Sequence, residues 1–178
     1  MKKLQALIFI LIISPVYSQY SIQKSCIARI DTIKYNLNLD DKDGLIFMMQ
    51  EEKLARDVYL TLGTLYKQKM FVNIPQSEQR HMDALKVLFN KYQITDPVAD
   101  YEVGIFHNEA FRKLFDDLVS KGRNSFQDAM LVGKEIEELD IEDLNKRIKQ
   151  TDNPDIKIIF SNLIKGSENH LRAFKKHL

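Results

Sequence analysis

Glu78 and His81, in the middle of the chain, have the residue types and the spacing of a metal-ligand pair. Residues three apart lie on one face of a helix, and an advance of about 100° per residue places both in a stripe of apolar side chains. A carboxylate and an imidazole are costly to bury unless a partner compensates them. A bound metal ion and a direct Glu–His hydrogen bond would each do so, and the pair alone leaves both interpretations open.

Other acidic and histidine residues fall on the apolar faces of three further predicted helices. Charged side chains are rarely buried without a partner. An acid or a histidine on an apolar helix face therefore suggests that it binds a partner in the core. Glu137 and Asp140 are again three residues apart. Together, the inward ionisable groups predict a metal site built from several helices: Glu52, Glu78, His81, Glu137, Asp140 and His170.

Two acids lie at the edges of these faces, Glu51 next to Glu52 and Asp143 after Asp140. Arg56 leans inward one turn after Glu52, where it would pair with a buried carboxylate. Tyr59 shares the face of Glu52, and we expect either an ordinary core tyrosine or a residue that hydrogen-bonds a ligand or is redox-active at the metal site.

Four long amphipathic helices must position these groups. Apolar spacings of three and four predict helices from about Asp40 to Lys69, from Asn73 to near Tyr92, from Ser125 and from Asn153. Capping residues support all four starts, with Asp40, Asp41 and Asp43 at the first helix and with Pro75 and Pro154 in first turns. Residues 93–124 read as a long crossover with one short helix at 109–121.

This order predicts an all-α fold, a ferritin-like four-helix bundle with one long crossover that carries a short extra helix. In such bundles a Glu from each of two helices and a Glu-x-x-His from each of the other two hold two metal ions. Here Ser167 stands where the fourth helix would have its Glu. Asp140 would then supply the missing carboxylate, or would orient a ligating imidazole through its free N–H.

Four segments carry a family resemblance: EEKLARDVY at 51–59, SEQRHM at 77–82, IEELDI at 136–141 and NHLRAF at 169–174. Together, over residues 40–178, they resemble a bacterial and archaeal ferritin-like family described as a domain of unknown function. The first segment also resembles, more distantly, the rubrerythrin and bacterioferritin group. The resemblance implies a di-iron site without an established reaction, and Ser167 puts peroxidase-like turnover in doubt.

The predicted function is a di-metal carboxylate protein that oxidises Fe²⁺ with O₂ or peroxide. Carboxylates and imidazoles suit two iron ions, and manganese or zinc would also accept them. The alternative is a non-catalytic interaction or stress-response module in which the same groups hold a structural metal or form a buried polar network.

The start of the chain predicts export. Lys2, Lys3 and the apolar run that follows are typical of a secretory signal peptide at residues 1–18, ahead of an extended arm at 19–39 and the bundle domain at 40–178. We therefore expect a periplasmic or extracellular protein with no membrane span after cleavage; the alternative is that the apolar run stays as an uncleaved N-terminal anchor. Cys26 is the single cysteine, so no internal disulfide forms.

The composition excludes one class of partner. The chain has 178 residues, a net charge of +1 and no basic stripe, so we expect no nucleic-acid binding. The sequence does not fix the oligomeric state and leaves a homodimer open.

Overall fold

The computed structural model describes residues 30, 33–98 and 100–178, which form helices joined by loops, with no strand among them. In chain order the helices are α2 (Leu39–Tyr66), α3 (Met70–Tyr92), α4 (Glu109–Gly122), α5 (Phe126–Gln150) and α6 (Pro154–Lys175). The predicted all-α bundle with a short helix in its crossover is confirmed. The predicted signal peptide, Cys26 and most of the predicted arm lie outside the described residues.

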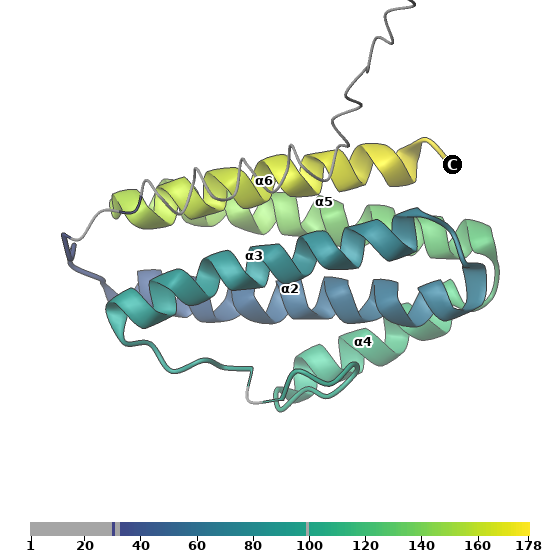
Figure 1. Ribbon diagram of the computed structural model, residues 1–178, viewed down its shortest axis with the longest axis horizontal. Helices are drawn as coiled ribbons and strands as arrows, with labels where there is room; N and C mark the ends of the chain where they lie inside the picture. The colour runs from purple at the N-terminus through teal and green to yellow at the C-terminus, as the bar shows by residue number, and fades with distance from the viewer. Residues whose placement is uncertain (1–29, 31–32, 99) are drawn as a thin grey trace, which may run out of the picture.

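The four long helices pack as two antiparallel pairs (Figure 1). α2 lies beside α3, and α5 lies beside α6. The pairs meet mainly through α2 with α5 and α3 with α6, while α4 packs along the outside of α2 and α5. No described helix combines the length and apolarity that crossing a bilayer requires.

Side-chain caps begin most of the helices, as the sequence predicts. Ser125 and Asn153 cap α5 and α6, and Pro154 is the first residue of α6. α2 begins slightly earlier than predicted, because Asn38 and Asp41 form a capping box in which each side chain accepts a hydrogen bond from the other's backbone N–H.

The predicted start of α3 is wrong. The helix begins at Met70 rather than at Asn73, and Pro75 lies inside it. The extra turn buries Phe71, whose ring lies 6.4 Å from that of Tyr59 and 6.2 Å from that of Phe174 between centroids. Proline in a helix interior removes one backbone hydrogen bond, and this aromatic packing offsets the loss.

The ionisable residues lie between two apolar clusters of the core. On α2, buried apolar residues between Leu45 and Met49 belong to the first cluster, and those from Leu54 onward belong to the second. Glu52 therefore lies between the two clusters. The same division recurs on α3, α5 and α6. Apolar packing on both sides buries the polar layer, and burial strengthens the electrostatic interactions within it.

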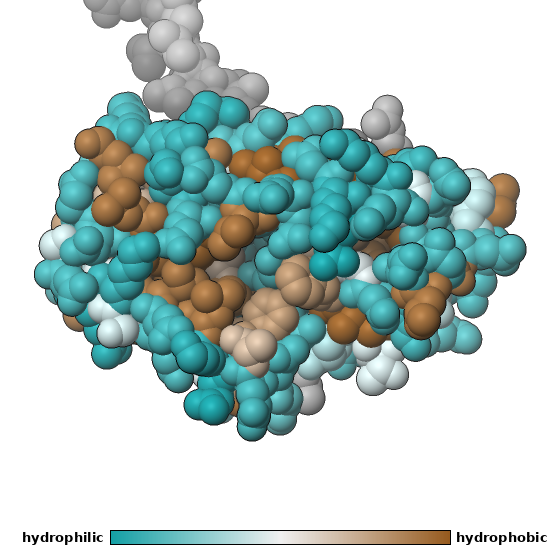
Figure 2. Space-filling model, turned by 180° about the vertical axis from the view of Figure 1, so that it is seen from behind, coloured by the Kyte–Doolittle hydropathy of each residue, from teal (hydrophilic) through white to brown (hydrophobic). Residues whose placement is uncertain are grey.

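The outer surface is mainly hydrophilic, with patches of apolar side chains between the polar ones on the face opposite to the first view (Figure 2).

Candidate metal centre

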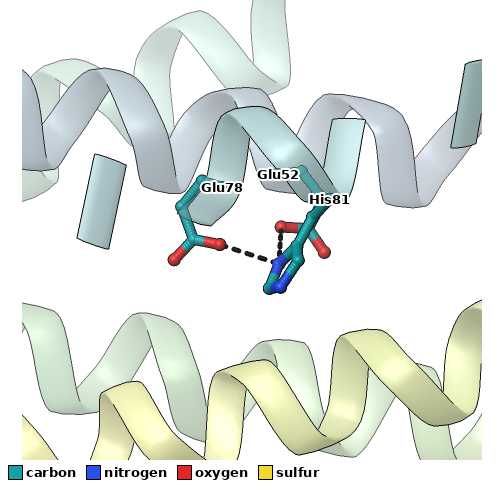
Figure 3. A group of neighbouring side chains, drawn as sticks. All are labelled: Glu52, Glu78 and His81. Atoms are coloured by element: carbon teal, nitrogen blue, oxygen red, sulfur yellow. Dashed lines mark hydrogen bonds and ion pairs between the residues drawn. The ribbon is translucent and has the colours of Figure 1, made fainter. Parts of the chain in front are cut away.

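The first half of the site joins α2 to α3. Glu52, Glu78 and His81 project from these helices toward α5 and α6 (Figure 3). His81 Nδ1 lies 3.0 Å from Glu52 Oε2 and 2.9 Å from Glu78 Oε2. The helical spacing of three therefore places the Glu-x-x-His pair together, as the sequence predicts.

The second half of the site joins α3 to α5 and α6. His170 Nδ1 lies 2.9 Å from Glu78 Oε1 and 3.5 Å from Glu137 Oε2. Tyr59 donates a 2.7 Å hydrogen bond to Glu137 Oε1, so that carboxylate is fixed from the α2 side.

Glu78 belongs to both halves. Its two oxygens face different histidines, and the imidazole rings of His81 and His170 stack with centroids 5.6 Å apart. In each trio, Glu52–Glu78–His81 and Glu78–Glu137–His170, one ligand atom per residue lies within 4.8 Å of the others. Two overlapping sets of two carboxylates and one imidazole are therefore suited to two cations that share Glu78.

Unpaired polar atoms support this fit. Glu52 Oε1, Glu78 Oε1 and His170 Nδ1 are buried without a hydrogen-bond partner. Glu78 Oε1 and His170 Nδ1 are close, yet their approach lacks the alignment of a hydrogen bond. Buried polar atoms left unpaired are costly, and a cation between them would satisfy them.

Burial and mutual contact shift the pKa values of these groups. Burial raises the pKa of Glu52 and of Glu137 to about 7. Burial alone would lower the pKa of His170, but Glu78 and Glu137 outweigh it and raise the value to about 10. Glu52 and Glu78 likewise raise the pKa of His81 well above its usual range.

Glu78 shows the opposite shift. Burial would raise its pKa, but the charges of His170 and His81 outweigh burial and hold it well below the usual range. Without metal, protons on the imidazoles therefore occupy positions that cations would take.

Asp140 lies outside both trios. Its Oδ2 atom is 2.5 Å from Ser167 Oγ, which also lies 3.0 Å from the Leu163 carbonyl oxygen. Asp140 thus contacts the residue that replaces the expected fourth-helix Glu. Its Oδ1 atom is buried without a partner, and the charges of Glu52 and Glu51 add to burial in raising its pKa.

Gly166 is a supporting residue that the sequence analysis missed. A Cβ atom at this position would lie 2.4 Å from His81 Nε2, so only glycine leaves room for the imidazole. The sequence did carry a signal for this residue. A glycine inside a helix destabilises that helix, so its presence often means that a neighbouring group comes too close to the backbone for a side chain.

A separate buried cluster fastens the crossover to α2. Arg56 pairs with Asp57 rather than with Glu52, at 2.8 Å, and donates a hydrogen bond to the Tyr101 carbonyl. Lys53 pairs with Asp57 and donates to the Glu102 carbonyl. The prediction that Arg56 pairs with a buried carboxylate is confirmed, and that carboxylate faces the crossover instead of the metal centre.

Comparison with known proteins identifies the family. Residues 41–178 match the family described as "Uncharacterized protein domain (DUF2202)". Uncharacterized protein MJ0754 of Methanocaldococcus jannaschii is 53% identical over 145 residues, which cover 82% of this chain and 78% of that protein. The crystal structure of hypothetical protein MJ0754 from Methanococcus jannaschii superposes with a TM-score of 0.82 at 52% identity, over 84% of this chain and 85% of that one. The chain therefore belongs to the DUF2202 family.

Proposed function

We propose that this protein binds two iron ions between its four long helices and uses them to react with O₂ or peroxide. The single observation that carries the proposal is the position of Glu78, whose two carboxylate oxygens face the two separate histidines. Resemblance to the ferritin-like bundle, in which paired Glu and Glu-x-x-His ligands hold two metals, supports it further.

Each residue of the centre has a role in this proposal. Glu78 would help to hold both cations, and His81 and His170 would hold one each. Glu52 and Glu137 complete the trios and neutralise positive charge. Two Fe²⁺ ions held in this way would each lose one electron to become Fe³⁺, and these two electrons with two protons from solvent would reduce one H₂O₂ to two water molecules.

Tyr59 supports the centre from α2. Its hydroxyl donates to Glu137 Oε1, which leaves Glu137 Oε2 directed at His170. We propose that Tyr59 orients this carboxylate, and that a phenol this close to the centre is also placed for redox chemistry.

Iron binding and oxidation test the proposal directly. The purified chain, stripped of metal, is titrated with Fe²⁺ without oxygen, after which O₂ or peroxide is admitted and the near-ultraviolet absorption of ferric iron is followed. We expect about two irons per chain and oxidation faster than in buffer. Glu78→Gln should lose the paired site, whereas Glu168→Gln, which changes an exposed acid on α6, should keep it.

A second candidate function follows from the contacts of His81. Its Nδ1 atom already faces two carboxylates, so the same groups would also form a structural polar network in an interaction or stress-response module. Absence of bound metal, with iron oxidation no faster than in buffer, would reject the first function and favour the polar network. Bound metal without faster oxidation would favour a structural metal.

Export remains part of the proposal. The basic and apolar start of the chain supports a signal peptide, and hence a periplasmic or extracellular protein. N-terminal sequencing of the protein from cells that make the full chain would test it, with cleavage expected before Gln19.

A further inference from the structure

A second group of carboxylates lies beside the candidate metal centre, at the interface of α2 and α5. Glu51 precedes Glu52 on α2, and its side chain lies close to that of Asp143, which follows Asp140 by about one turn of α5. Glu51 and Asp143 are half-buried, whereas Glu52 and Asp140 are only 2% and 8% exposed. The four acids therefore form a series of decreasing exposure that leads toward the centre.

Unpartnered oxygens occur along this series. Asp140 Oδ1, Glu52 Oε1 and Glu51 Oε2 are all buried and have no hydrogen-bond partner. Burial raises the pKa of Asp140, and the charges of Glu52 and Glu51 add to this effect, so the three acids lie near one another. Buried carboxylate oxygens without partners are expensive, and a divalent cation is the ligand that would satisfy several acids at once.

One positive group faces the outer acids. The Arg147 guanidinium lies 4.2 Å above the Phe47 ring, and its charge acts on Glu51. Its Nε atom has no hydrogen-bond partner. This opposing charge weakens cation binding at Glu51. Weak binding is what a transient site needs.

We propose that Glu51 and Asp143 form an outer carboxylate pair that receives divalent cations from solvent and passes them, beside Asp140, to Glu52 of the metal centre. Among the described residues, these outer acids do not form a three-ligand cluster of the kind seen in the centre. The pair therefore does not retain a cation, and its effect is on the rate at which cations reach the centre. The inference rests on the proposed function, because it requires a centre that retains the cations.

The rate of cobalt uptake tests the outer pair. Co²⁺ is mixed with the metal-free full chain in a stopped-flow instrument, and the visible absorption of the bound ion is followed. Above pH 8, where Glu51 is ionised, Glu51→Gln and Asp143→Asn should each slow loading about tenfold, the lower end of electrostatic acceleration by a charged cleft. The final absorbance and the number of cobalt ions per chain should stay unchanged.

Glu142→Gln is the matched control, because it removes one negative charge from an exposed position of α5 next to Asp143. It should load at the wild-type rate. Circular dichroism and thermal melting of the metal-free variants check folding. We expect Glu51→Gln and Asp143→Asn to melt no lower than wild type, since each replaces a half-buried carboxyl group by a neutral amide of the same shape.

Three results would overturn the proposal that the outer pair delivers cations to the centre. Loading of Glu51→Gln and Asp143→Asn within about twofold of the Glu142→Gln rate would show that the outer acids do not assist transfer. A lower final absorbance would make them ligands of the centre itself. A wild-type chain that takes up no cobalt would reject this inference together with the proposed centre, whereas normal loading of all variants would reject the inference alone.

Discussion

Gly166 of α6 leaves the space that the imidazole of His81 fills. A methyl group at position 166 would lie 2.4 Å from His81 Nε2, far inside van der Waals contact. Gly166→Ala should therefore displace His81, lower metal content from about two ions per chain to about one, and destabilise the fold by about 1–3 kcal/mol through overpacking. Elemental analysis and urea unfolding measure the two effects.

Gly44→Ala is the control for Gly166→Ala. A Cβ at position 44 would meet the Arg147 side chain at 3.4 Å, an ordinary contact. We expect normal metal content and up to about 1 kcal/mol of added stability, because alanine favours the helix. Two bound metals in Gly166→Ala would show that His81 is not a ligand.

The stability of the metal-free protein should fall as pH rises. Burial raises the pKa of Glu51 to about 8 and the pKa values of Glu52 and Glu137 to about 7, all from 4.5. The pKa of His170 is raised from 6.5 to about 10 by Glu78 and Glu137, against the effect of burial. Each group binds more protons folded than unfolded between its two pKa values, so the free energy of unfolding decreases with pH there.

Glu78 acts in the opposite direction at low pH. The charges of His170 and His81 hold its pKa below 4.5, so the stability it contributes is present above that pH and is lost in acid. Metal-free stability should therefore be highest near pH 5, which lies just above the unfolded pKa of a glutamate. Urea unfolding at pH 3, 5, 7 and 9 would measure this, and a maximum at pH 9 would contradict it.

Metal binding should release protons. His81 and His170 are protonated without metal near neutral pH, because neighbouring carboxylates raise their pKa values, and a ligating imidazole nitrogen must lose its proton. The apparent affinity for Co²⁺ should increase from pH 6 to pH 8. Calorimetry in buffers of different ionisation enthalpy counts the protons, and an affinity independent of pH would exclude these histidines as ligands.

Helical phase made most of the centre predictable. Glu52, Glu78, His81, Glu137 and His170 share inward faces, and the structure brings them together as two trios. Asp140 shares the inward face too, but it contacts Ser167 and lies outside both trios. The position of a residue around the helix axis specifies which side of the helix the residue occupies. It does not specify which side chain of another helix the residue contacts.

Residues buried by the crossover were not predictable in this way. Lys53 and Asp57 are almost fully buried, although neither lies on the face that packs in the bundle core. The loop that covers them returns from residues 101–106, far along the chain. Likewise, α3 begins before Asn73 because distant rings pack on Phe71, which local capping signals do not record.

Tyr59→Phe should raise the pH at which the metal centre fills. The Tyr59 hydroxyl lowers the pKa of Glu137 against the larger effect of burial, which raises it. Without that hydroxyl, Glu137 holds its proton to higher pH. Leaving Glu137 Oε1 unpaired should also cost about 1–3 kcal/mol of stability. Cobalt loading measured as a function of pH gives the pH at which half of the metal centre is filled.

Tyr66→Phe is the control for the phenol. The Tyr66 hydroxyl donates to the Gly122 carbonyl at 2.9 Å, away from the centre. This variant should lose stability without moving the loading midpoint. Equal midpoints in Tyr59→Phe and wild type would mean that Tyr59 has no influence on Glu137.

Asp57→Asn should release the crossover from α2 while sparing the metal centre. Asp57 is 0% exposed and pairs with both Lys53 and Arg56. It also accepts a 3.0 Å hydrogen bond from the Gly104 N–H. Removing its charge leaves two buried cations uncompensated, so we expect a loss of about 3–5 kcal/mol and faster hydrogen exchange at residues 101–106.

Asp117→Asn provides the comparison for Asp57→Asn, because Asp117 forms an exposed ion pair with Lys113 on α4. Such pairs contribute at most about 1 kcal/mol. Both variants should bind as much cobalt as wild type at a temperature where they are folded, since neither acid belongs to the two trios of the centre. Equal stability losses in the two variants would show that the buried cluster does not hold the crossover. Loss of cobalt in Asp57→Asn alone would instead mean that the crossover helps to hold the metal centre in shape.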